Sequence, residues 1–197
     1  DMHTGVLVIG SGAAGVSAAI EARLAGANVL LIESLSQFGG SSAMSGGVVY
    51  AGGGTALQKA LKVEDSVEQM YRFISLVGGV HPPLDKIQLY CEGSAEHFDW
   101  LLAQGIPYTD KLTLAKGLPM GDESLYFSGT EQAWPARELA TPAPRGHVPG
   151  VEGMNGGRRL MQALLSQAKA LGVRLQGRVR AQRLVTESDG RIAGVIV

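Results

Sequence analysis

The sequence predicts an α/β fold built on a parallel β-sheet, and three consecutive features support this prediction. The mostly apolar, β-prone residues 5–9 run directly into a Gly-x-Gly-x-x-Gly motif. An alanine-rich helical pattern follows from Ala13 to about Ala25, and a second apolar strand, residues 29–32, ends on Glu33. Strand, glycine turn, helix, strand and terminal acid in this order are typical of the first βαβ unit of a dinucleotide-binding domain.

Each part of this unit has a physical role in holding a dinucleotide. Gly10 permits the tight turn, Gly12 lets the backbone approach a pyrophosphate, and Gly15 lets the helix pack on the strand. The free N–H groups and the positive dipole end of the helix then face the phosphates. Glu33 can accept hydrogen bonds from ribose hydroxyls and would repel a 2′-phosphate. The alternative is a glycine turn with a purely structural role.

Composition places the chain among globular proteins of one domain or one and a half. Of its 197 residues, 45% are hydrophobic and 18% charged, with a net charge of −1, so nucleic acid is not the expected partner. The 28 glycines gather around the first 54 residues without a period. No apolar run is long enough to span a bilayer and no secretion signal opens the sequence, so a cytoplasmic location is expected.

A single cysteine, Cys91, excludes an internal disulfide framework and a cysteine-based metal cluster. It lies in a segment with a helical pattern, so we expect a buried thiol rather than a reactive one. No other pattern of metal ligands stands out, and we predict no metal site.

The loop after the second strand, residues 34–54, contains three clusters of small residues at 39–42, 45–47 and 52–54. Glycine and serine let the main chain approach a flat ligand and offer N–H and hydroxyl donors. A flexible linker is the alternative, but Phe38, Met44 and Tyr50 are apolar anchors that a solvated tether would lack. We therefore expect a ligand-lining loop.

These motifs resemble those of the flavoprotein family of fumarate reductases and 3-ketosteroid dehydrogenases. The resemblance rests on Gly-x-Gly-x-x-Gly, then Glu33, then Gly-Gly-Ser-Ser-x-Met-Ser-Gly-Gly at residues 39–47. It implies a Rossmann-like FAD-binding domain, with FAD rather than NAD as cofactor and this loop beside the flavin ribityl chain and ring. Together, fingerprint and resemblance give the expected cofactor-binding residues Gly10, Gly12, Ala13, Ala14, Gly15, Glu33, Ser34, Gly40, Ser41, Ser42, Ser45, Gly46, Gly47 and Val179.

The middle of the chain predicts helices. A short helix is expected over residues 55–62, and a capping pattern at 65–68 begins a second that ends at Gly78-Gly79. A third follows Pro82-Pro83 and runs to Leu102, with Gly93 as a point where it could break. Its apolar residues are Ile87, Leu89, Tyr90, Phe98, Trp100, Leu101 and Leu102. We expect the aromatic ones to belong to the core rather than to a binding site.

Residues 109–156 show little regularity but carry many aromatic, guanidinium and imidazole groups. Tyr-Phe-Ser-Gly, Ala-Trp-Pro-x-Arg and Pro-Arg-Gly-His-Val-Pro most resemble the 3-ketosteroid 4-ene (5α) dehydrogenase branch of the family. The resemblance makes Tyr126, Arg145 and His147 candidates to line the substrate site. For His147 alone, an ordinary loop histidine is an equally good interpretation.

The last third predicts an amphipathic helix from Leu160 to Gly172, a short strand over 173–175 and a hairpin around Asp189-Gly190. In the resembled family these are the third parallel strand and the β-meander of the FAD domain, and Val179 matches a position whose backbone meets the adenine. The resemblance covers residues 1–197 as the N-terminal portion of an FAD-binding domain. It implies that the capping domain and the C-terminal part of the FAD domain lie outside this chain.

The function that the resemblance implies is FAD-dependent dehydrogenation of a 3-ketosteroid, with a tyrosine-type base removing a proton and flavin N5 accepting hydride. The catalytic residues stay unassigned, because in the family they lie mostly in the part outside this chain, and Tyr50, Tyr108 and Tyr126 are only site-lining candidates. The expected partners are a steroid-like small molecule and the remaining polypeptide. The alternatives are a fumarate reductase-like enzyme acting on a dicarboxylate and a non-catalytic dinucleotide-binding module; an NAD dehydrogenase leaves the glycine-serine loop without a role.

Overall fold

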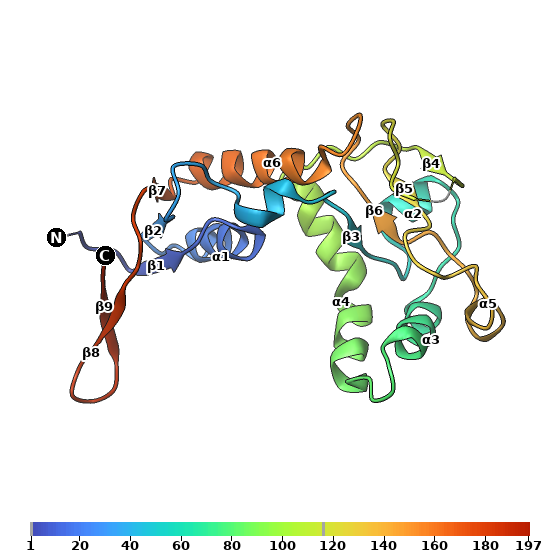
Figure 1. Cartoon of the computed structure of the whole chain (residues 1–197), viewed down its shortest axis with the longest axis horizontal. Helices are drawn as coiled ribbons and strands as arrows, with labels where there is room; N and C mark the ends of the chain where they lie inside the picture. Colours follow the sequence, from blue (N-terminus) through green and yellow to red (C-terminus); the bar gives the residue numbers. More distant parts are fainter. Residues whose placement is uncertain (1, 116) are drawn as a thin grey trace. The chain divides into compact units, whose positions relative to one another are not determined.

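The computed structural model of the protein describes residues 2–115 and 117–197 and divides the chain into two compact units (Figure 1). The first unit comprises the segment up to Met44 together with Met161–Val197, and the second comprises Ser45–Leu160. Each unit has its own sheet and helices.

The first unit is built on a three-stranded parallel sheet. Its strands are β1 (Val6–Ile9), β2 (Val29–Ile32) and β7 (Arg174–Gln176), in the order β1-β2-β7. All four residues of the central strand β2 are buried, which fits its continuous apolar sequence because helices cover such strands on their faces. The predicted parallel sheet is confirmed, including its third strand from the far end of the chain.

Helix α1 (Ala13–Leu24) follows β1 immediately and packs on β1 and β2 (Figure 1). Its residues Val16, Ala19 and Ile20 are fully buried. The close packing needs a glycine at position 15, because a Cβ there would lie 2.0 Å from the carbonyl oxygen of Gly10. This is the packing role that the third fingerprint glycine predicts.

The rest of the first unit consists of the 3₁₀ helix η1 (Gly40–Met44) and an antiparallel hairpin of β8 (Arg183–Thr186) and β9 (Ile192–Ile196). The hairpin occurs where the Asp-Gly turn predicts it, with an irregularity in register between Val185 and Thr186. Among the described residues, the expected β-meander is present as these two strands.

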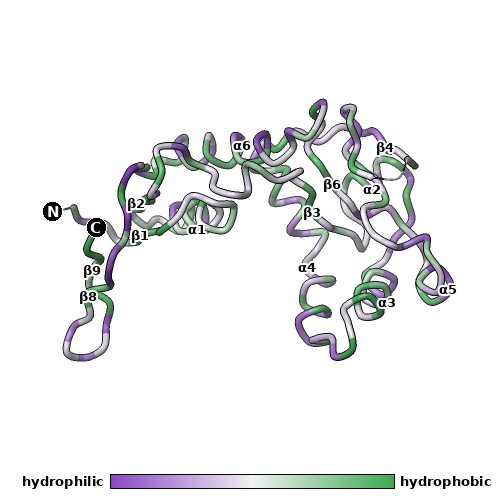
Figure 2. Tube along the Cα trace, in the orientation of Figure 1, coloured by the Kyte–Doolittle hydropathy of each residue, from purple (hydrophilic) through white to green (hydrophobic). Residues whose placement is uncertain are grey.

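Helix α6 (Gly156–Ala170) begins in the second unit and continues into the first. Hydrophobic and hydrophilic segments alternate along its turns, as expected of an amphipathic helix (Figure 2). Its buried face consists of Leu160, Met161, Leu164 and Ala168.

The second unit contains the helices α2 (Ala56–Ala60), α3 (Val67–Val77), α4 (Leu84–Ala103) and α5 (Ala136–Leu139). Thr55 and Gln58 form a reciprocal capping box at α2, and the Ser66 hydroxyl caps α3 by accepting from the Gln69 N–H.

Helix α4 runs without interruption through Gly93, the point at which its sequence would allow a break. Contacts on both sides of this glycine keep the helix continuous, since Cys91 and Ser94 are buried. Of the aromatic residues expected in the core, Phe98 is fully buried, but the expectation is wrong for Tyr90, which is 46% exposed. Leu89 and Leu102 are also exposed, at 73% and 38%. The apolar stripe of α4 is therefore narrower than its composition predicts.

Cys91 belongs to a core cluster with Met70 and Ile87, where α3 packs against α4. Its side chain is fully buried, and this burial raises the pKa of the thiol to about 11. The expectation of a buried thiol agrees with this placement.

A four-stranded sheet, absent from the sequence-based prediction, lies in the second unit. Its strands are β3 (Val49–Tyr50), β6 (Gly146–His147), β5 (Leu125–Tyr126) and β4 (Leu112–Thr113), in that order. Each strand has only two residues, too few to show an alternating pattern. This sheet gives order to much of the region that appears irregular in sequence.

Candidate cofactor-binding site

The N-terminus of α1 is an open anion-binding position in the first unit. Gly12 is the N-cap residue and offers no side chain to cap the helix, and the first turn carries no acidic residue. The N–H of Ala13 donates to Ser42 Oγ over 3.1 Å. The other N–H groups of a first helical turn lack acceptors within the helix, so this end presents donors and a positive dipole to a ligand.

Glu33, at the end of β2, is 8% exposed and is bonded on both carboxylate oxygens. Oε2 accepts from the N–H and the hydroxyl of Ser11 at 3.0 and 2.7 Å. Oε1 accepts from the Leu35 N–H and the Ser34 hydroxyl, both at 3.0 Å. The bond from the Leu35 backbone, followed by those from Ser11, lowers the pKa of Glu33 to about 2, so it is ionised at neutral pH.

These four bonds use about all the acceptor positions of a carboxylate. The ribose contact expected of Glu33 would therefore replace one of its present donors, and Ser34, which is exposed, is the donor most open to replacement. Ser11, which has no role in the sequence-based prediction, also accepts from the Gly39 N–H at 3.0 Å. A hydroxyl beside the fingerprint glycines was the available signal for this residue.

The segment after β7 lies alongside the end of β2. The N–H of Val179 donates to the carbonyl oxygen of Glu33 over 2.9 Å, and the N–H of Arg178 donates to that of Leu35 over 3.0 Å. Val179 is thus next to the acid that terminates β2. Its contact with adenine stays a prediction.

The 3₁₀ helix η1 completes this side of the site. A Cβ at Gly40 would lie 3.6 Å from the Cα of Gly12, so the two backbones are in near contact. Within the first unit the structure brings together the expected residues Gly10, Gly12, Ala13, Ala14, Gly15, Glu33, Ser34, Gly40, Ser41, Ser42 and Val179.

The other expected flavin-side residues, Ser45, Gly46 and Gly47, lie in the second unit against the start of α6. The N–H of Gly157 donates to the Ser45 carbonyl oxygen over 3.1 Å. Gly47 has φ +73°, and a Cβ there would lie 2.3 Å from the backbone carbon of Gly156. Gly47 is buried, and its backbone packs directly against that of Gly156, an approach that only a residue without a Cβ permits.

Arg145, expected to line the substrate site, is fully buried and paired with Asp65 within the second unit. Its Nε and Nη2 donate to the two carboxylate oxygens at 2.9 and 2.6 Å. Asp65 also accepts from the Gly53 N–H and the Gln58 side-chain amide. The sequence-based interpretation assigned Asp65 only to a helix cap; the signal for its partner was a buried arginine, which needs a carboxylate.

His147 is also fully buried, with its ring 4.4 Å from that of Phe98 between centroids. Nδ1 lies 3.0 Å from the Arg145 carbonyl oxygen, which can only accept, so this nitrogen carries the proton. Nε2 then accepts from the Thr55 hydroxyl at 2.9 Å. Burial lowers the pKa of His147 to about 4, which keeps the ring neutral at pH 7.

Tyr126 is 5% exposed, and desolvation raises the pKa of its hydroxyl. Tyr126, Arg145 and His147 therefore converge within the sheet β3-β6-β5-β4 and pack inside this unit. Their role in lining a substrate site stays a prediction. In the described part of the chain, no group of three or more His, Cys, Asp or Glu side chains is arranged to hold a metal ion.

We expect Glu33→Gln to change how folding stability depends on pH. A carboxylate with a folded-state pKa of about 2 stabilises the fold fully above its ordinary value of 4.5 and loses this contribution as the pH falls toward 2. Urea unfolding midpoints between pH 2 and 6 should show a steeper acid loss for the wild type than for Glu33→Gln. Glu21→Gln, on the exposed face of α1, controls for the lost charge. Parallel curves for wild type and Glu33→Gln would contradict the prediction.

His147 should produce a separate stability change at higher pH. Its folded-state pKa of about 4 lies below the ordinary 6.5, so the unfolded chain binds the proton more readily and stability falls as the pH drops from 6.5 to 4. In His147→Gln this pH dependence of stability should disappear. The free energy of unfolding should also fall by about 1–3 kcal/mol, because the Thr55 hydroxyl loses the acceptor to which it donates. The exposed His97→Gln should keep the slope in the same urea titration. An unchanged slope in His147→Gln would refute this assignment.

Comparison with known proteins gives the chain a family. The family described as "FAD binding domain" matches residues 5–197. The 3-oxo-5-alpha-steroid 4-dehydrogenase of Comamonas testosteroni is 38% identical over 199 residues, covering 98% of this chain and 37% of that protein. The fumarate reductase (cytochrome) of Shewanella frigidimarina is 31% identical over 195 residues, covering 98% of this chain and 29% of that protein.

A solved structure shows the same arrangement of backbone. The 3-ketosteroid-Δ4-(5α)-dehydrogenase of Rhodococcus jostii RHA1, solved in complex with 4-androstene-3,17-dione, superposes with a TM-score of 0.94 at 45% identity. The match covers 99% of this chain and 42% of that structure. The chain thus spans well under half the length of these relatives.

The bare helix N-terminus of α1, the ionised acid after β2 and the adjoining glycine-serine segment fit the adenosine and pyrophosphate parts of FAD. In the described part of the chain, no helix is both long and apolar enough to cross a membrane. With a family match over residues 5–197, this chain belongs to the FAD-binding-domain family of flavoproteins, and its cofactor is FAD.

Proposed function

We propose that this chain is the FAD-binding portion of an oxidoreductase that dehydrogenates a 3-ketosteroid. The observation that carries the proposal is the likeness to a ketosteroid dehydrogenase over 99% of the chain. We propose the corresponding domain organisation, which the same likeness supports: residues 1–197 would be the N-terminal portion of the FAD domain, and the capping domain and the C-terminal part of the FAD domain would lie outside them.

The residues of the first unit would hold the nucleotide end of FAD. The first turn of α1, including Ala13 and Ala14, directs N–H groups and the helix dipole at the pyrophosphate. Gly12 and Gly40 leave the space for it, because neither carries a side chain. The Glu33 carboxylate accepts a hydrogen bond from a ribose hydroxyl in place of the one from the Ser34 hydroxyl.

The assignment of Gly46 and Gly47 to the flavin end rests on the family likeness, since Gly47 is buried against the backbone of Gly156. When bound, FAD supplies the hydride acceptor at N5 of its ring, and the protein positions that ring. No group of this chain is assigned as the base. Burial raises the pKa of Tyr50, Tyr108 and Tyr126, so none of the three phenols is prepared to accept a proton near neutral pH.

A dicarboxylate substrate, as in the fumarate reductases, needs cationic groups to hold two carboxylates. Arg145, a candidate for lining the substrate site, is the cation to consider for this role, and it is held by both oxygens of Asp65 inside the second unit. This pairing leaves its charge compensated. The observation favours the steroid over the dicarboxylate.

We expect Gly12→Ala to separate cofactor binding from folding. The added Cβ would lie 3.6 Å from Ser42 Oγ, an ordinary contact, so the fold should persist. The methyl group would nevertheless occupy space that the pyrophosphate needs, and an overpacking cost of about 1–3 kcal/mol corresponds to a loss of roughly fivefold to 150-fold in FAD affinity. Fluorescence titration with FAD and thermal unfolding measure the two effects.

Two further glycines serve as controls for this variant. Gly93→Ala places a methyl group in open space on α4 and should leave FAD affinity unchanged. Gly15→Ala should lower the melting temperature, because its Cβ collides with the Gly10 carbonyl oxygen. If Gly12→Ala binds FAD as tightly as the wild type, the pyrophosphate does not bind at this turn.

The substrate proposal is tested on the complete polypeptide that contains this chain, loaded with FAD. Under anaerobic conditions a saturated 3-oxo-5α-steroid should bleach the flavin absorbance near 450 nm, since dehydrogenation reduces the flavin. Fumarate should not reoxidise the reduced protein. If the steroid does not bleach the flavin and fumarate rapidly reoxidises the reduced protein, the enzyme acts on a dicarboxylate instead. FAD binding with neither reaction would leave a non-catalytic module.

A further inference from the structure

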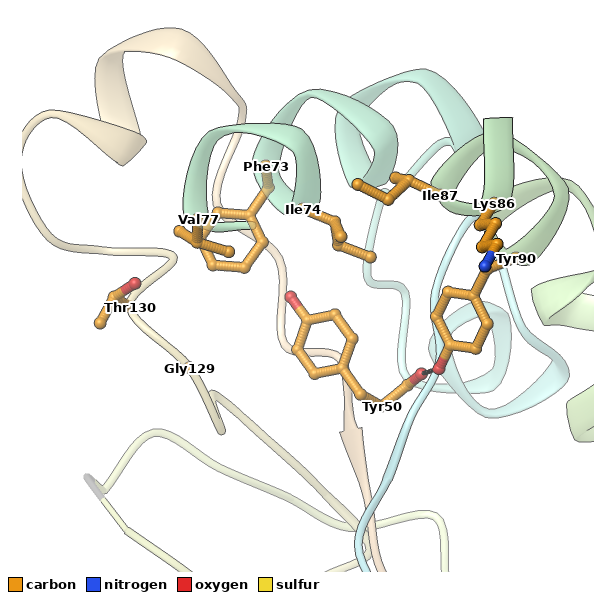
Figure 3. Close-up of a pocket in the computed structure, with 9 residues that line it drawn as sticks. All are labelled: Tyr50, Phe73, Ile74, Val77, Lys86, Ile87, Tyr90, Gly129 and Thr130. Carbon is orange, nitrogen blue, oxygen red and sulfur yellow. Dashed lines mark hydrogen bonds between the residues drawn. The ribbon is translucent and has the colours of Figure 1, made fainter. Parts of the chain in front are cut away.

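A pocket lies in the second unit, and apart from Tyr50, a candidate for lining the substrate site, its residues have no role in the proposed function. A pocket of about 530 Å³ opens between α3, α4 and the loop at Gly129, and Tyr50 of β3 forms its floor (Figure 3). Its volume falls within the range of roughly 300–1,000 Å³ that small-molecule sites occupy. The lining residues are Tyr50, Phe73, Ile74, Val77, Lys86, Ile87, Tyr90, Gly129 and Thr130.

The walls of this pocket are almost wholly apolar. Tyr50 and Phe73 stack with ring centroids 6.3 Å apart, and the aliphatic side chains of Ile74, Val77 and Ile87 continue the same surface (Figure 3). Flat aromatic and branched aliphatic walls favour a ligand with a rigid apolar body, since burying such a surface releases water from both partners.

One hydrogen bond and one cation–π contact hold the aromatic walls of the pocket in place. The Tyr90 hydroxyl donates to the carbonyl oxygen of Tyr50 and so ties α4 to β3. The Arg145 guanidinium carbon lies 5.7 Å from the centre of the Phe73 ring, and Arg145 is fixed by Asp65. Because its walls are anchored in this way, the cavity does not need to form as the ligand enters.

One cation stands at the rim. Lys86 lines the pocket one helical turn before Tyr90, and its side chain is exposed (Figure 3). Among the residues that the structure describes, no carboxylate forms an ion pair with its ammonium group. The nearby Glu131 is 1% exposed and accepts from the Gly129 N–H behind the wall.

We propose that this pocket binds an amphiphilic organic anion, whose apolar ring system enters between Tyr50, Phe73 and Ile74 and whose acidic group meets Lys86 at the rim. The apolar walls select the body of the ligand and the unpaired cation selects its charge.

The test compares two fluorescent probes that differ in one charged group. 8-Anilino-1-naphthalenesulfonate carries the apolar rings and an anion, and N-phenyl-1-naphthylamine carries the same rings without the sulfonate. Lys86→Gln should lower the affinity for the sulfonate probe about twofold to fivefold, the range for an exposed ion pair. The affinity for the uncharged probe should stay the same. Lys59→Gln, on α2 and outside the pocket, should alter neither affinity.

Two tryptophan variants on neighbouring residues test the location. Val77 lines the pocket and is 49% exposed, whereas Leu76 is 39% exposed and lies outside the lining. Val77→Trp should fill part of the cavity and lower the affinity for both probes about tenfold. Leu76→Trp should bind both probes as tightly as the wild type does. Both sites are exposed enough for the larger side chain to be tolerated in the fold, which circular dichroism and thermal unfolding can check.

Three outcomes would overturn the proposal. Equal probe affinities in Val77→Trp and Leu76→Trp would place the binding elsewhere. If Lys86→Gln binds the sulfonate probe as tightly as the wild type, Lys86 does not select anionic ligands. If sedimentation shows the wild type to be a dimer that Val77→Trp dissociates, the pocket is covered by a second copy of the chain.

Discussion

The carboxylate of Glu33 is the constraint on which the nucleotide end of the structure depends. It is buried and ionised at the end of β2, so it needs donors on both oxygens, and Ser11 supplies two of them from the turn after β1. This pairing fixes the distance between the end of one strand and the start of the helix that follows the other. Ser11 Oγ then receives the Gly39 N–H, which brings the glycine-serine segment to the same point. One charged group thereby organises three chain segments around the N-terminus of α1.

A second buried charge plays the corresponding role in the other unit. Arg145 donates to both oxygens of Asp65, while its Nη1 is buried without a hydrogen-bond partner among the described residues. Asp65 also accepts from Gly53, Gln58 and Ser66. A buried ion pair contributes little net stability because desolvation offsets its attraction. Its effect here is positional, since it fixes the glycine run after β3.

The sequence predicts the first unit well because its signals are local and continuous. The apolar strands, the fingerprint glycines and Glu33 lie within 29 residues, and both strands and α1 form where they are expected. Prediction of the second unit is poorer because two-residue strands show no periodicity and Arg145 finds its partner 80 positions away. The apolar pattern of α4 predicts where the helix lies but not which of its apolar residues are buried. Leu89 faces solvent because no other element of the described chain packs against it, and the sequence of the helix does not contain that information.

The buried thiol of Cys91 has a consequence for watching this protein unfold. With a pKa of about 11, about one thiol in a thousand is ionised at pH 8, and its side chain has no exposed surface. An alkylating reagent reaches it only when α4 separates from α3. Since this is the sole cysteine of the sequence, the rate of alkylation is a built-in reporter of how often these two helices part.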